Sequence, residues 1–227
     1  MAASGMVKSL LALCLMALCP ACSNLSTAQR EQIQSIRVGA VSETSKAYQK
    51  PAHLKPNEGL AVAVTGAVAP LVGPAMYGAI AQSNSQLPRP TKDVNAAIKS
   101  LIPSDLNEML RRELETSLRQ TNYFGPRLNK KAPSQWTVSS TIVLYSLWKQ
   151  NDGTYHPIVA ANTRLIGPNG EKAALRINNC IPPSRQHPSA PLSDYLSKPG
   201  LLRAHFEEAT HHLADNIARS LNEAATE

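Results

Sequence analysis

The stretch QWTVSSTIVLYSLWKQ, residues 135–150, decides the fold. Apolar side chains recur at every second position and polar ones stand between them, which predicts a half-buried β-strand. The apolar parity holds Trp136, Val138, Ile142, Leu144 and Trp148, and the other holds Thr137, Ser139, Thr141 and Tyr145. We therefore expect one long strand with a single apolar face.

Two more strands are expected after this one. The turn sequence NDG at 151–153 leads into YHPIVAANTRLI at 155–166, and GPNG at 167–170 leads into EKAALRIN at 171–178. Glycine-containing turns of this length connect antiparallel neighbours, because parallel strands need a long crossover. The three segments together predict an antiparallel meander.

Two amphipathic helices flank the meander. LNEMLRRELETSLRQTN at 106–122 and LLRAHFEEATHHLADNIARSL at 201–221 both place apolar residues at i, i+3 and i+4. Ser104 is the expected N-cap of the first, and Gly125 with Pro126 should stop its continuation. VNAAIKSLI at 94–102 also has a helical period, whereas 178–199, with five prolines, predicts an irregular loop.

These elements predict an α+β fold, in which an antiparallel sheet of about four strands carries two amphipathic helices on one face. A first strand is expected within IQSIRVGAVS at 33–42. We assign 1–21 to a signal peptide, 22–33 to a tether with Ser26 and Gln29 at capping-box spacing, and 34–226 to a single domain.

The segment LAVAVTGAVAPLVGPAMYGAIAQ, residues 60–82, is an insertion in this plan and carries no charge. It is long enough to span a bilayer, although its glycines and prolines weaken a helix. A segment packed against its own domain is the favoured interpretation, and docking on a partner protein or insertion into the outer leaflet are alternatives. The sequence leaves these interpretations open.

The N-terminal residues are typical of a secretion signal. The apolar run LLALCLMALC at 10–19 follows one cation, Lys8, and precedes a small-x-small pattern ending at Ala21. Cleavage after Ala21 leaves 206 residues and lowers the formal charge from +7 to +6. Cys22 then becomes the first residue of the mature chain.

Ala21 and Cys22 resemble the lipobox of bacterial lipoproteins, in which a small residue precedes the cysteine that is acylated. The resemblance implies lipid attachment at Cys22, and Ser23, which is not aspartate, implies sorting to the outer membrane on its periplasmic side. Ordinary secretion is the alternative. Two or three acyl chains would hold the protein on a membrane, whereas one chain binds only marginally.

The positive charge is spread along the chain. No run exceeds two cations, as in Arg111-Arg112 and Lys130-Lys131, and export would remove the chain from the cytoplasm. We expect no nucleic-acid partner, and a modest attraction to anionic membranes.

Few residues suggest catalysis. His205, Glu208, His211 and His212 share the last helix, but a di-iron site would need a matching second helix. There is no Gly-x-Ser-x-Gly elbow and no phosphate-binding glycine loop, and the pair Cys180 and His187 lacks an orienting third group. We expect a noncatalytic protein without cofactor or metal. The alternative is a periplasmic enzyme or metal-binding protein that uses the His/Glu cluster.

The helix at 106–122, the meander and the final helix resemble the plan of auxiliary lipoproteins of ABC-type envelope transporters, over about residues 94–225. The resemblance implies an accessory or assembly subunit of a transport or secretion complex, and it transfers no functional residue except Cys22. Residues 60–82 are the expected contact with the envelope partner. A lipid or peptidoglycan ligand between sheet and helices is a further interpretation.

Overall fold

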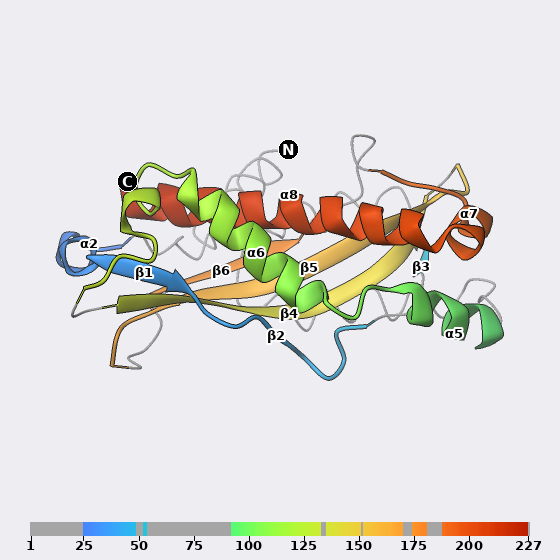
Figure 1. Ribbon diagram of the computed structural model, residues 1–227, viewed down its shortest axis with the longest axis horizontal. Helices are drawn as coiled ribbons and strands as arrows, with labels where there is room; N and C mark the ends of the chain where they lie inside the picture. The colour runs from blue at the N-terminus through green and yellow to red at the C-terminus, as the bar shows by residue number, and fades with distance from the viewer. Residues whose placement is uncertain are drawn as a thin grey trace, which may run out of the picture.

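The computed structural model describes residues 25–48, 52–53, 92–132, 135–150, 152–169, 174–180 and 188–226. The expectations for the signal peptide, for Cys22 and for residues 60–82 lie outside these ranges. The described residues form two layers, a mixed sheet and a layer of helices (Figure 1), so the predicted two-layer α+β class is confirmed.

The meander is present as predicted. Strand β4 (Gln135–Lys149) pairs antiparallel with β5 (Tyr155–Ile166), which pairs antiparallel with β6 (Leu175–Cys180). The other edge of β4 carries three short strands, β1 (Ser35–Val38), β2 (Ser42–Glu43) and β3 (Ala52–His53), which follow one another along it.

The sheet is mixed rather than wholly antiparallel, because β1, β2 and β3 all run parallel to β4. Helices between β3 and β4 return the chain to the end at which β1 began, which is the long crossover that parallel pairing needs. The sequence prediction missed this because a strand's alternation carries no information about the direction of its neighbour.

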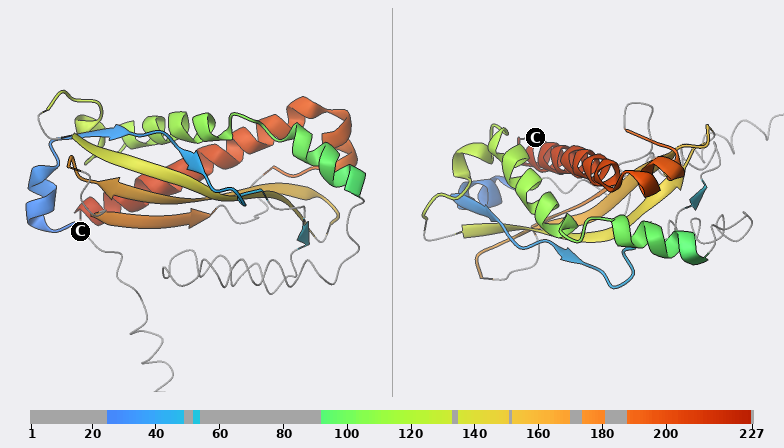
Figure 2. Two further views of the ribbon diagram at one scale, coloured as in Figure 1. Left: turned by 90° about the horizontal axis from the view of Figure 1, so that it is seen from below. Right: turned by 45° about the vertical axis from the view of Figure 1, so that its right-hand side comes forward.

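The helix layer consists mainly of α6 (Leu106–Arg119) and α8 (Pro199–Thr226), which lie side by side over one face of the sheet (Figures 1 and 2). We call this covered face the inner face and the opposite one the outer face. The shorter α5 (Lys92–Leu101) matches the helical period predicted there. Helix α7 (Leu192–Ser197) and the start of α8 lie where an irregular loop was expected.

The core lies between the inner face and the two long helices. The predicted stripes of both helices are buried there, together with inward-facing residues of the sheet. Buried members with no exposed surface include Leu110, Leu114, Leu118, Phe206, Leu213, Ile217, Leu221, Val138, Ile142 and Leu165. Burial of these apolar side chains is the main stabilising contribution to the fold.

Helix α6 begins differently from the prediction. Its N-cap is Asp105 rather than Ser104, and the Asp105 side chain makes no capping hydrogen bond. Instead, both carboxylate oxygens of Asp105 accept hydrogen bonds from Arg203 of α8, at 3.0 and 2.8 Å. This two-point contact joins the start of α6 to α8.

A β-bulge divides the outer face into two halves. The pairing of β4 with β5 shifts between Ile142 and Leu144, so Ile142 faces the core while Leu144 faces outward. Beyond this point the outward side chains are buried and mostly apolar; they are Leu144, Trp148, Ile158 and Ala160, with two polar residues, Ser146 and His156. The prediction of one apolar face along all of residues 135–150 is therefore wrong after Ile142.

The described chain begins with a packed segment. Helix α2 (Thr27–Gln32) starts with the capping box predicted from Ser26 and Gln29. Leu25 and Ile33 on either side are each 1% exposed, and the Leu25 N–H donates to the Ala224 carbonyl at 2.9 Å. Residues 25–33 therefore pack as part of the domain, in contrast to the tether expected for 22–33.

Candidate functional site

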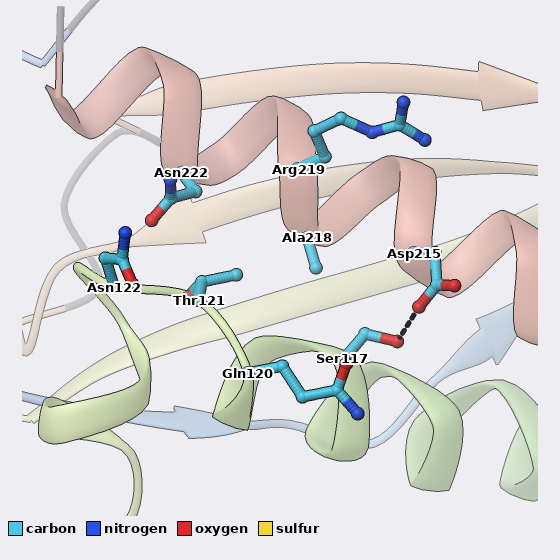
Figure 3. Close-up of a pocket in the computed structure, with 8 residues that line it drawn as sticks. All are labelled: Ser117, Gln120, Thr121, Asn122, Asp215, Ala218, Arg219 and Asn222. Carbon is cyan, nitrogen blue, oxygen red and sulfur yellow. Dashed lines mark hydrogen bonds between the residues drawn. The ribbon is translucent and has the colours of Figure 1, made fainter.

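A polar hollow lies between the last turn of α6 and the C-terminal half of α8 (Figure 3). Its volume is about 270 Å³. Hydroxyl, amide and charged side chains predominate in its lining, which consists of Ser117, Gln120, Thr121, Asn122, Asp215, Ala218, Arg219 and Asn222. Such a lining suits a polar ligand with several hydrogen-bonding groups.

The floor of the hollow is a contact between the two helices. Ser117, only 4% exposed, donates its hydroxyl proton to Asp215 Oδ1 across 2.5 Å. Asn222 Oδ1 accepts the Tyr123 N–H at 3.1 Å and so holds the turn after α6 against α8. In Figure 3 the Asn122 and Asn222 side chains point toward one another.

His211 extends this contact into a chain of polar groups. Its Nδ1 lies 2.9 Å from Glu113 Oε2, and its Nε2 lies 3.4 Å from Asp215 Oδ2. A carboxylate can only accept, so His211 Nδ1 carries the proton. The hydrogen bond to Glu113 raises the pKa of His211 above its usual value, because burial is outweighed by that bond and the nearby negative charges.

The raised pKa of His211 gives the contact a pH dependence of known sign. Stabilisation by the protonated imidazole is complete below the unfolded pKa of about 6.5 and is lost as the pH rises through the higher folded pKa. Because the His211 side chain is 46% exposed, solvent screening keeps this contribution small.

The order of these groups determines what they can do chemically. A nucleophilic serine needs its hydroxyl hydrogen-bonded to a base that accepts the proton, usually a histidine. Here Ser117 donates to Asp215, and His211 lies on the far side of that carboxylate. The chain Ser117–Asp215–His211–Glu113 therefore joins two helices and leaves Ser117 without an imidazole partner.

His205 makes a separate contact. Its Nδ1 lies 2.8 Å from the Tyr195 hydroxyl, which donates to the Tyr155 carbonyl at 3.0 Å. Since that hydroxyl has one proton, His205 must donate from Nδ1. Burial lowers the pKa of His205, so the neutral imidazole is favoured.

The His/Glu cluster predicted on the last helix does not converge. His205 contacts Tyr195, His211 contacts Glu113, and His212 Nε2 lies 3.7 Å from Glu208 Oε1. Within the described residues, no three histidine, cysteine or acidic side chains are arranged to hold a metal ion. The geometry of this helix does not support the metal-binding alternative.

Sequence reasoning missed the hollow, although one signal was present. Ser117 follows Leu114 by three residues and so interrupts the apolar stripe of α6 with a polar side chain. A buried polar residue needs a partner, which indicates a polar group on the facing helix. The identity of that group, Asp215, required the relative positions of α6 and α8.

Other predicted functional residues are not tested by the geometry. Cys22 and His187 lie outside the described residues, and of Cys180 only the backbone, at the end of β6, is described. In the described ranges, none of the helices combines the length and apolar composition needed to cross a membrane.

Comparison with known proteins gives structural similarity without sequence similarity. No protein-family model matches the chain, and no curated protein sequence matches it. A dodecameric PelC variant from Paraburkholderia phytofirmans is 8% identical with a TM-score of 0.40, covering 86% of this chain and 90% of that one. Protein XCC0632 from Xanthomonas campestris, with family model DUF330, is 10% identical with a TM-score of 0.44, covering 90% and 89%.

Proposed function

We propose that this protein is a noncatalytic lipoprotein of the outer membrane, anchored through acylated Cys22 on the periplasmic side. The observation that carries the proposal is the position of Leu25. Its side chain is 1% exposed and its N–H is bonded to the end of α8, three residues after the proposed acylation site. Three residues span at most about 11 Å.

So short a connection keeps the domain against the membrane rather than on a long tether. Helix α2, the start of β1, the start of β4 and the end of α8 all lie at the end of the domain where Leu25 packs (Figure 1). This end would face the lipid.

Within the envelope, the proposed role is that of an accessory or assembly subunit that acts by binding. The polar groups of the hollow support this role, because Ser117 and Asp215 already satisfy each other across the helix interface. The hollow offers amide and hydroxyl groups to a partner or ligand without an activated nucleophile. The role in transport or secretion rests on the resemblance of the sequence plan to auxiliary lipoproteins.

The anchor is tested with a Cys22→Ser variant of the full chain, expressed in a Gram-negative host. The wild-type chain is expected in the outer-membrane fraction, with an intact mass equal to residues 22–227 plus diacylglycerol and an acyl chain. Cys22→Ser is expected in the soluble fraction without added lipid. Cys180→Ser is the matched control and should fractionate like the wild type. An unmodified wild-type chain in the soluble fraction would refute the proposal.

The partner contact is proposed to lie in residues 60–82, because 23 residues without a charge need a place to be buried. Deleting them is expected to leave a folded domain that no longer co-purifies with its partner from detergent-solubilised envelopes. The competing interpretation is that residues 60–82 cover the outer face of their own sheet. Trp148 is buried on that face, and in a Trp136→Phe background its fluorescence reports whether it becomes exposed to water. If deletion shifts Trp148 emission to the red and lowers Tm, the segment covers its own sheet and the partner assignment fails.

A further inference from the structure

Three arginines share the outer face of the sheet in the half nearest Leu25. Arg164 of β5 lies directly opposite Arg176 of β6 and also opposite Ser139 of β4. Directly opposed residues project to the same side of a sheet, and Ser139 is on the outward parity. Arg37 of β1 joins them, since its Nε donates to the hydroxyl of the outward-facing Thr137 at 3.3 Å.

The side chains around these arginines are neutral and mostly polar. The outward positions of this half include Ser42, Thr137, Ser139, Thr141, Asn162, Ile166 and Asn178, in addition to the arginines. None of them is an acid. We call this surface, Arg37, Arg164 and Arg176 with their neutral neighbours, the arginine face.

Among the described residues, no acidic side chain compensates the charge of the arginine face. All three arginines are exposed, and within the described ranges no ion pair includes any of them. Arg164 and Arg176 repel each other, because like charges directly opposite on antiparallel strands are unfavourable. An anion placed between them would remove this repulsion and accept hydrogen bonds from both guanidinium groups.

The spacing of the three charges indicates an extended anionic surface rather than one small ion. Neighbouring strands are about 4.8 Å apart, so Arg164 and Arg176 are adjacent, whereas Arg37 is two strands from Arg164, or about 10 Å across the sheet. A sheet face is broad and gently twisted, and these guanidinium groups would contact several anionic groups at once.

The position of the face relates it to the membrane. Arg37 follows the start of β1 by two residues, and β1 starts at the end of the domain where Leu25 packs (Figures 1 and 2). We propose that the arginine face docks on the phosphate headgroups of an anionic phospholipid bilayer and so sets the orientation of the domain on the membrane. This proposal rests on the proposed lipid anchor for its biological setting, but the contact itself does not need acylation.

The test uses the full mature chain carrying Cys22→Ser, so that no acyl chain contributes to binding. Sedimentation is measured with vesicles of 30% phosphatidylglycerol in phosphatidylcholine and with phosphatidylcholine alone, at low and high salt. The unacylated chain is expected to bind only the anionic vesicles, and binding should weaken with salt. Each Arg→Gln change is expected to lower the partition coefficient about fivefold, and the triple variant about a hundredfold.

A charge-matched control distinguishes binding through the arginine face from binding through the net charge of the protein. Arg112, Arg119 and Lys198 are exposed in the helix layer, and their triple Gln variant removes the same charge. It should keep anionic-vesicle binding within about twofold of the parent. The arginine-face triple should retain its Tm, because it removes a like-charge pair.

Either of two results would overturn the proposal. Equal losses in the two triple variants would show that net charge alone drives binding. No sedimentation of the unacylated chain with anionic vesicles would show that the face does not dock on phospholipid headgroups. Because acylation is absent from this experiment, either result leaves the Cys22 fractionation test independent.

Discussion

Replacing Phe206 with alanine is expected to lower the free energy of unfolding by about 3–5 kcal/mol. Phe206 is fully buried in α8, within the core between the helix layer and the inner face of the sheet. The substitution removes most of an aromatic side chain from a packed interior and leaves a cavity that the neighbouring strands and helix cannot fill. Urea unfolding followed by tryptophan fluorescence measures the change, with an unaltered m-value confirming that both states stay comparable.

Leu196→Ala is the control for this prediction. Leu196 is 39% exposed, and it is the only large apolar side chain that is exposed in the part of the chain described by the structure. Its loss is expected to change stability by less than about 0.5 kcal/mol, as for most surface positions. Similar costs for Phe206→Ala and Leu196→Ala would contradict the assignment of the core.

The helices and the meander were predictable because each depends on a local periodicity. The stripe of α6 and the alternation at the start of β4 are read from neighbouring residues, and the structure places both elements where those patterns stood. The parallel pairing of β1 with β4 was not predictable in this way. The paired residues are about a hundred positions apart in the sequence, and the chain between them crosses over through helices. No single segment carries a pattern that indicates this pairing.

The polar hollow and the arginine face were also predictable only in their local features. Ser117 is visible as a polar interruption in an apolar stripe, but its partner Asp215 is 98 residues away. Arg164 and Arg176 are separated by a turn, and only the register of β5 against β6 makes them directly opposed. Cys22 was predicted from a local motif, and it remains a prediction.

The bulge in β4 predicts that the two halves of the outer face differ in their tolerance of a buried charge. Ile158 and Asn162 are both outward-facing residues of β5, on opposite sides of the division that the bulge creates. Ile158 is 0% exposed, whereas Asn162 is half-buried among polar neighbours. Ile158→Asp is expected to cost more than about 4 kcal/mol, because a carboxylate would be buried in the mostly apolar half of the outer face.

Asn162→Asp is the matched control, since it creates the same side chain on the same strand and face. It should change the free energy of unfolding by less than about 0.5 kcal/mol, because its carboxylate stays hydrated and lies near Arg164. If Ile158→Asp does not fold, Ile158→Ala gives the measurement, with an expected loss of about 2–5 kcal/mol. Equal tolerance of aspartate at both positions would mean that the outer face is polar throughout and that the register shift between Ile142 and Leu144 does not divide it.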